Sequence, residues 1–153
     1  MKYILRKKPQ GCVFCEKTKE ESDKTTYILE RSDLSYTILN MYPYNNGHLM
    51  VLPYRHIGDI AELSIEELTD IMKSVSRATK ALKIALKPEG FNIGANIGKV
   101  AGAGIADHIH FHVVPRWNAD TNFMPVIAKT NVIPESLESV YVKIKDALKE
   151  LDG

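Results

Sequence analysis

The sequence predicts one α+β domain, in which about five strands form a mainly antiparallel sheet and two long helices cover one of its faces. Three observations carry the prediction: short strand-like segments joined by turns, two long segments with helical spacing of apolar residues, and an ordinary globular composition. The chain has 153 residues, of which 44% are apolar and 25% charged, enough for one core without cross-links. We therefore expect residues 1–153 to form a single domain.

The charge and hydropathy of the chain favour a soluble protein. The net charge is +1, so nothing points to a dedicated nucleic-acid or membrane surface. There is no apolar stretch of 18 residues, and the basic start lacks the apolar run of a signal peptide. We expect a cytoplasmic protein with no nucleic-acid or membrane partner.

The first three strands are expected at residues 26–30, 35–40 and 48–53. The first two are rich in Tyr, Thr and Ile, and residues 31–34 between them favour a hairpin. Proline, asparagine and glycine at 43–47 indicate a loop before the third strand, which is a continuous apolar run.

Two long helices are expected. Ser64-Ile-Glu-Glu67 has the form of a capping box, apolar residues recur at helical spacing through residue 85, and Pro88 and Gly90 end this helix. The second is expected at 134–152, because Pro134 suits a first helical turn. Its apolar stripe consists of Leu137, Val140, Tyr141, Ile144, Leu148 and Leu151.

The most informative segment is a histidine-rich strand at 108–115, which follows a strand at 91–96 and a glycine-rich loop at 97–107. Residues two apart in a strand share a face, so His108, His110 and His112 line one side. The core side then receives Ile109, Phe111 and Val113. Crowding disfavours protonation, which leaves one histidine neutral as a nucleophile while its neighbours donate hydrogen bonds. A surface strand that happens to be rich in histidine is the alternative.

The glycine loop places Gly94, Gly98, Gly102 and Gly104 around Lys99. Glycine lets a backbone approach a phosphate and direct N–H groups toward it. The loop is not a P-loop, because the residue after Lys99 is neither Ser nor Thr. It is either a phosphate cradle beside the histidines or a flexible connection.

The two cysteines lie in the N-terminal segment 1–20. Cys12-Val-Phe-Cys15 has the spacing of half a tetrahedral zinc site, which needs two further ligands. A pair of free thiols is the alternative. A thioredoxin-like motif is disfavoured, because no βαβ unit precedes the pair.

Two stretches of the chain resemble the histidine-triad (HIT) family. His108-Ile-His-Phe-His-Val-Val114 resembles the triad signature, and residues 40–56 resemble the Asn, Pro, Gly-His, Pro and His pattern that precedes it. The tail at 115–123 is similar to the bacterial diadenosine tetraphosphate phosphorylase branch. The resemblance covers roughly residues 12–125, and it implies a HIT-like half-barrel that pairs as a homodimer.

The resemblance also implies roles for the matched residues. His110 would be the nucleophile that forms a nucleotidyl-histidine, and His112 would contact the α-phosphate. His108 would support the site or bind a metal. The implied ligands of a structural zinc are Cys12, Cys15, His56 and His108. The candidate substrate-binding residues are Asn40 beside the ribose, the supporting His48, Asn96, the loop glycines Gly98, Gly102 and Gly104, and Trp117.

The implied function is cleavage of diadenosine polyphosphates at the α-phosphate, with adenine nucleotides as substrates. Phosphate as the acceptor would make the protein a phosphorylase, and water would make it a hydrolase. Other readings are a purine nucleoside phosphoramidate hydrolase, a nucleotide-binding module without catalysis, and a zinc-binding interaction protein.

Several roles stay open at this stage. The segment 102–107 lacks the Gln or Ser of many triad enzymes, which leaves Asp107 as the polar candidate for protonating a leaving group. Trp117 could stack on adenine or plug a dimer edge. Arg116 and Lys99 are candidates for an acceptor phosphate, unless Arg116 pairs with Asp120 as an ordinary surface contact.

Overall fold

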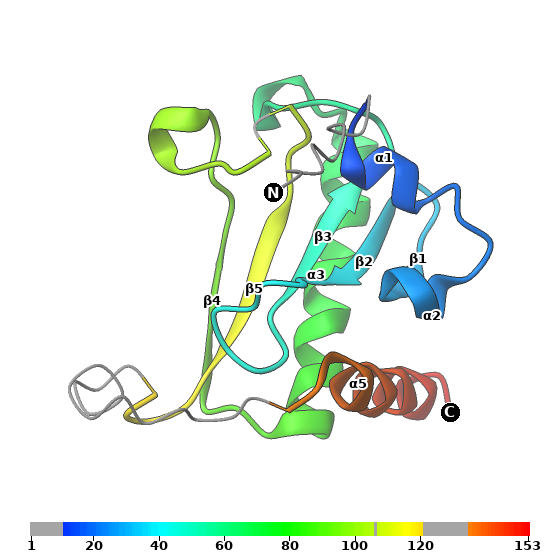
Figure 1. Cartoon of the computed structure of the whole chain (residues 1–153), viewed down its shortest axis with the longest axis vertical. Coiled ribbons are helices and arrows are strands. Elements are labelled where there is room, and N and C mark those ends of the chain that lie inside the picture. Colours follow the sequence, from blue (N-terminus) through cyan, green and yellow to red (C-terminus); the bar gives the residue numbers. More distant parts are fainter. Residues whose placement is uncertain (1–10, 106, 121–134) are drawn as a thin grey trace, which may run out of the picture.

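The computed structural model describes residues 11–105, 107–120 and 135–153. Its strands form one antiparallel sheet in the order β1-β2-β3-β5-β4 (Figure 1). The strands are β1 (Ile28–Arg31), β2 (Ser35–Leu39), β3 (Leu49–Pro53), β4 (Gly90–Gly94) and β5 (Phe111–Arg116). The α+β class, the five strands and the antiparallel sheet are thus confirmed.

Two long helices lie on one face of the sheet, as predicted. The helices of the described residues are α1 (Val13–Lys17), α2 (Asp23–Thr26), α3 (Ile65–Leu86) and α5 (Leu137–Leu151), with the 3₁₀ helices η1 (Ile60–Glu62) and η2 (Lys99–Ala101). Helix α3 crosses behind β2, β3 and β5, and α5 packs against α3 and β1 (Figure 1). No helix in the described ranges is long and apolar enough to cross a membrane.

The capping box predicted for α3 is present. The Ser64 hydroxyl accepts from the Glu67 backbone N–H at 3.1 Å, and the Glu67 carboxylate accepts from the Ser64 backbone N–H at 3.0 Å. Two otherwise unpaired donors of the first turn are satisfied in this way. Helix α5 has its N-cap at Ser136, and Pro134 lies outside the described residues.

The sheet separates two apolar layers. On β3, Leu49 and Val51 belong to the large core against α3 and α5, whereas Met50 and Leu52 belong to a smaller cluster on the other face. This is the alternation that a pleated strand imposes. Phe14 of α1 belongs to the smaller cluster, so the N-terminal segment covers part of the face opposite the long helices.

Two strands begin two or three residues later than predicted, for a physical reason. Strand β5 begins at Phe111 instead of residue 108, because its ladder with β3 ends at the Val51–Phe111 pair. Beyond that pair, Pro53 has no N–H to offer, and its carbonyl accepts a hydrogen bond from the His108 ring. Strand β1 begins at residue 28 because Tyr27 caps α2 in the left-handed conformation, at φ 64°.

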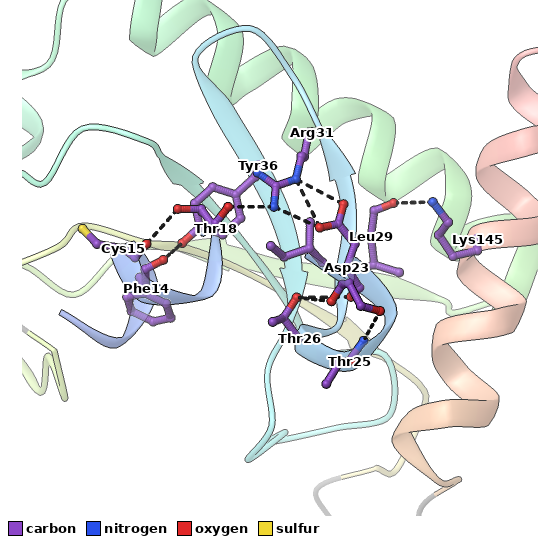
Figure 2. A network of polar contacts seen from close by, with 12 residues as sticks. Phe14, Cys15, Thr18, Asp23, Thr25, Thr26, Leu29, Arg31, Tyr36 and Lys145 are labelled. Atoms are coloured by element: carbon purple, nitrogen blue, oxygen red, sulfur yellow. Dashed lines mark hydrogen bonds and ion pairs between the residues drawn. The ribbon is translucent and has the colours of Figure 1, made fainter. Parts of the chain in front are cut away.

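The segment that carries α1 and α2 is tied to the sheet by Arg31 (Figure 2). The Arg31 guanidinium donates to both carboxylate oxygens of Asp23 at 2.9–3.2 Å, and to the Thr18 carbonyl at 3.1 Å. The Tyr36 hydroxyl of β2 donates to the Phe14 carbonyl at 3.1 Å. These contacts fix α1 on the sheet face that also bears the histidines.

Candidate functional site

The three histidines of the triad segment lie on the sheet face away from α3, in three different surroundings. Their neighbours Ile109, Phe111 and Val113 point into the main core, as predicted. His108 is fully buried, His110 is 7% exposed, and His112 is half-buried. They therefore do not form one open row of side chains, and a solvated, histidine-rich surface strand is excluded.

His110 is held in one tautomer by the backbone. Its Nδ1 lies 3.0 Å from the His108 carbonyl oxygen, which can only accept, so Nδ1 carries the proton. The other nitrogen, Nε2, then keeps its lone pair while the ring is neutral. The Phe14 ring lies 5.2 Å from the His110 ring, centre to centre, and covers it. This is the arrangement that a nucleophilic imidazole requires.

His112 is oriented by a second histidine. The Tyr44 backbone N–H donates to Nδ1 of His48 at 3.1 Å, so the His48 proton is on Nε2. That Nε2–H donates to Nδ1 of His112 at 2.8 Å. The proton of a neutral His112 is consequently on Nε2, where it is a hydrogen-bond donor. The rings of His110 and His112 are 4.8 Å apart, so this donor lies beside the His110 ring.

The surroundings of His48 and His112 keep these two rings neutral. Burial, followed by the nearby His112 and His110, lowers the pKa of His48 from 6.5 to about 4. Burial, followed by His110, also lowers the pKa of His112. Both rings are thus neutral near pH 7, in the tautomers that the hydrogen bonds define. The Asn40 amide nitrogen lies 3.5 Å from Nδ1 of His48, the ring nitrogen that can accept from it, and 3.4 Å from Nε2.

A cleft of about 400 Å³ opens beside His112. Its walls come from the loop before β3, from β4 and the residues after it, and from β5 and the turn that follows. The lining residues are Tyr44, Asn45, residues 92–94, Asn96, His112, Val114, Arg116 and Asp120. Asn96 and His112 are thus brought together as expected, whereas Asn40 and Trp117 are not among the lining residues.

The glycine loop adopts conformations that require glycine. Gly98 has φ 82° and Gly102 has φ 90°, and they flank η2. Gly98 accepts backbone hydrogen bonds from Ala101 and Ala103 at 3.2 and 3.3 Å, so the turn is hydrogen-bonded within itself. Gly102 lies near Asn96. A Cβ atom at this position would be 3.9 Å from the Asn96 amide nitrogen. Gly104 has open space around it, and Lys99 is exposed.

The cysteines meet two histidines, as the resemblance implies. The ligand atoms of Cys12, Cys15, His56 and His108 all lie within 4.8 Å of one another. Three sulfur-to-Nδ1 separations are 3.4, 3.5 and 3.6 Å. Tetrahedral bonds of about 2.3 Å to sulfur and 2.0–2.1 Å to nitrogen place S and N about 3.5 Å apart, so the cluster has the dimensions of a zinc site.

The fourth member of the cluster is prepared by its outer hydrogen bond. Nε2 of His108 lies 2.8 Å from the Pro53 carbonyl and donates to it, which leaves the Nδ1 lone pair facing both sulfurs. Metal-binding histidines are held in this manner. The same residue gives its backbone carbonyl to His110. Asp107 is exposed and lines a hollow with Cys12 and His56, outside the cleft at His112.

Arg116 is paired with Asp120, which was the alternative to an acceptor-phosphate role. Its Nε and one terminal nitrogen donate to the two carboxylate oxygens at 2.7 and 2.8 Å. These bonds are the main reason why the pKa of Asp120 lies well below its usual range. Asp120 also accepts from the Asn45 amide at 2.6 Å. A phosphate at Arg116 would therefore meet a carboxylate.

Sequence reasoning missed Phe14, Tyr44, Asn45, Asn92 and Asp120 as site residues. Asn45 appeared only as part of a turn signal, and Phe14 only as a spacer between cysteines. Asp120 was considered only as a partner for Arg116. The one available signal was the pair of tyrosines at 42 and 44, which are unusual in a polar turn.

The chain belongs to the HIT family, whose HIT domain matches residues 20–119. AP-4-A phosphorylase of Mycobacterium tuberculosis is 43% identical over 116 residues, which are 76% of this chain and 60% of that protein. The chain thus matches less than two thirds of that relative's length. Adenosine 5'-monophosphoramidase hnt1 of Schizosaccharomyces pombe is 30% identical over 139 residues, 91% of this chain and 99% of that protein.

Solved structures agree with the fold. A Zn-bound histidine triad family protein from Mycobacterium smegmatis has a TM-score of 0.76 at 27% identity, covering 93% of this chain and 96% of that one. A hypothetical histidine triad nucleotide-binding protein from Sulfolobus tokodaii has a TM-score of 0.76 at 26% identity, covering 92% and 94%. The family resemblance read from the sequence is confirmed.

Proposed function

We propose that the protein cleaves diadenosine polyphosphates at the α-phosphate through a covalent nucleotidyl-histidine on His110. The observation that carries the proposal is the hydrogen bond from Nδ1 of His110 to the His108 carbonyl, which frees Nε2 for attack. The neighbouring Nε2–H of His112 supports it as a donor to a phosphate oxygen. The name of the Mycobacterium tuberculosis relative supports diadenosine tetraphosphate as the substrate.

The chemistry has two displacements. In the first, the Nε2 lone pair of His110 forms a bond to the α-phosphorus, and the bond from that phosphorus to the bridging oxygen of the departing polyphosphate breaks. In the second, an acceptor oxygen attacks the same phosphorus, and the bond to Nε2 breaks. Splitting one displacement into two lowers each barrier. The donor on His112 stabilises charge on the phosphate oxygens in both steps.

The acceptor decides between two products. Phosphate yields ADP and water yields AMP. The name of the phosphorylase relative favours phosphate, whereas the Arg116–Asp120 pair argues against Arg116 as its binding site and leaves exposed Lys99 as a cationic candidate. We therefore propose that phosphate is the preferred acceptor and that the protein is a phosphorylase.

The test is product analysis with diadenosine tetraphosphate while phosphate is raised at constant ionic strength. ADP should replace AMP as phosphate rises. If AMP dominates at every phosphate concentration, the protein is a hydrolase. If no nucleotide product forms, the proposed activity is wrong.

A second candidate function is hydrolysis of adenosine 5'-phosphoramidate. It is favoured by the relative from Schizosaccharomyces pombe, which is matched over 99% of its length. The same nucleophile would serve, with an amine as the leaving group. Comparing kcat/KM for the phosphoramidate and for diadenosine tetraphosphate separates the two functions.

We also propose that Cys12, Cys15, His56 and His108 hold a structural zinc ion. The distances within the cluster and the Zn-bound relative from Mycobacterium smegmatis support this assignment. The ion would supply a cross-link between α1 and the histidine segment, and no catalytic step. Because His108 binds on one side and supports His110 on the other, the cross-link would steady the nucleophile.

The single domain over residues 1–153, the homodimer and the cytoplasmic location are proposals as well. An edge strand supports the dimer: among the described strands β4 pairs with β5 on one side, and its other edge is available to a second chain. Sedimentation at micromolar concentration should show a two-chain species, and a monomer there would contradict it.

A further inference from the structure

The cleft beside His112 is lined by side chains that suit an uncharged ligand. Among its described lining residues, the charged side chains are Arg116 and Asp120, and they bind each other through two hydrogen bonds of 2.7 and 2.8 Å. The volume of about 400 Å³ lies within the range of about 300–1,000 Å³ typical of small-molecule sites. A polyphosphate chain would gain little from such a neutral lining, whereas a nucleoside would fit it.

Two carboxamides in this cleft are oriented by their neighbours. Asn45 uses its amide nitrogen to donate to the Pro115 carbonyl at 3.0 Å and to Asp120 at 2.6 Å, so its oxygen is the group left to accept. Asn92 uses its oxygen to accept from Arg116 at 2.5 Å, so its amide nitrogen is left to donate. These two carboxamides thus offer one acceptor and one donor, the complement of an adenine edge with its N6 amino group and a ring nitrogen.

Tyr44 supplies an aromatic wall. Its side chain is 71% exposed, yet its ring lies 4.7 Å from the His48 ring and 6.0 Å from the His112 ring, nearly parallel to the latter at 28°. The backbone N–H of Tyr44 is bound to His48, and the next residue is bound to Asp120, so this ring is carried on an anchored loop. An exposed, anchored aromatic ring in a cleft is suited to stacking on a base.

We propose that this cleft binds the second nucleoside of the dinucleotide, the one that departs with the polyphosphate, by stacking its base on Tyr44 and hydrogen-bonding it to Asn45 and Asn92. The inference rests on the proposed function. It makes the leaving nucleoside a specificity element. Asn40, assigned by resemblance to the ribose of the attacked nucleotide, is not among the lining residues, so the two nucleosides occupy different places around His112.

The test compares diadenosine tetraphosphate with adenosine 5'-tetraphosphate, which lacks only the second adenosine. For the wild type, kcat/KM should be higher for the dinucleotide. Tyr44→Leu should reduce that ratio by about 5- to 100-fold, the usual scale of one stacked base, and Tyr44→Phe should restore it. Asn92→Ala should also reduce the ratio. The matched control is Tyr42→Leu, in the same loop and 84% exposed but outside the cleft lining.

A ratio that changes no more in Tyr44→Leu than in Tyr42→Leu overturns the proposal. If the wild type cleaves neither compound, the proposed function fails, and the cleft is then tested by adenosine binding followed by NMR. Shifts of the β4 amides that weaken in Tyr44→Leu support the nucleoside site. If adenosine leaves the β4 amides unchanged, the site is refuted.

Discussion

Nε2 of His48 lies 2.8 Å from Nδ1 of His112, and the backbone N–H of Tyr44 fixes which of the two carries the proton. Replacing His48 by Asn should therefore free the His112 ring and its tautomer. We expect turnover to fall on the order of 100-fold, within the range for a positioned proton donor. The ¹⁵N shifts of His112 should report mixed tautomers. Unchanged shifts would contradict the proposed control of the His112 tautomer by His48.

The same pair makes stability depend on pH. The pKa of His48 is about 4 in the folded protein and about 6.5 when unfolded, so the unfolded chain binds more protons between these values. The contribution of neutral His48 to the free energy of unfolding is complete above pH 6.5. It is lost as the pH falls toward 4, by up to about 3 kcal/mol.

Urea unfolding at pH 7 and pH 5 measures this loss. The wild type should lose more stability between the two values than His48→Asn does. The comparison cancels the carboxylates and the histidines that do not contact residue 48, which both proteins share. Equal losses would show that His48 is not held neutral by its surroundings.

His110 should be essential for turnover. The His110 side chain is buried beneath Phe14, so His110→Ala would leave a gap and His110→Gln is the better test. We expect the glutamine variant to lose several orders of magnitude in turnover, because the covalent route is closed. Circular dichroism should show a folded protein. Near-normal turnover would move the role to another residue.

Metal content should depend on the cysteine pair. Protein purified without added zinc should contain about one zinc per chain, and Cys12→Ser should lower both the zinc content and the melting temperature. Val13→Ala is the matched control, since this residue lies between the cysteines on α1 and offers no ligand. Substoichiometric metal that Cys12→Ser leaves unchanged would rule out the site.

Arg116 and Asp120 should act as a unit. If Arg116 serves to hold Asp120, then Arg116→Ala and Asp120→Ala should cause similar losses of stability, and the double variant should lose less than their sum. Neither variant should change the ADP-to-AMP ratio, because neither residue is expected to bind the acceptor phosphate. Additive losses, together with a phosphate response lost in Arg116→Ala alone, would restore Arg116 as the phosphate ligand.

The elements that the sequence predicts well are those whose signals are local. The capping box at Ser64, the periodic helix after it and the alternation around His110 each fit within one segment. Helices α1 and α2 were missed because four or five residues are too few to show a helical period. Strand β4 ends two residues before the prediction, at Gly94.

The candidate site divides in the same way. The zinc ligands were assigned by the family pattern, since nothing in the spacing between Cys15 and His108 indicates contact. The cleft could not be predicted, because Tyr44, Asn92 and Asp120 meet only when β4, β5 and the loop before β3 are assembled. Asn45 reaches Asp120 across 75 residues of chain and Asn92 reaches Arg116 across 24, beyond the reach of any local pattern.

The length of the segment 108–112 is fixed by the contacts of its three histidines. One backbone delivers His108 to the cysteines, His110 to the space beneath Phe14 and His112 to the cleft, while Ile109 and Phe111 fill the core between them. Inserting or deleting one residue would exchange the two faces, sending imidazoles into the apolar layer and apolar side chains toward the cysteines and the cleft. A one-residue insertion or deletion in this segment is therefore expected to disturb the cysteine–histidine cluster, the place of His110 and the cleft together.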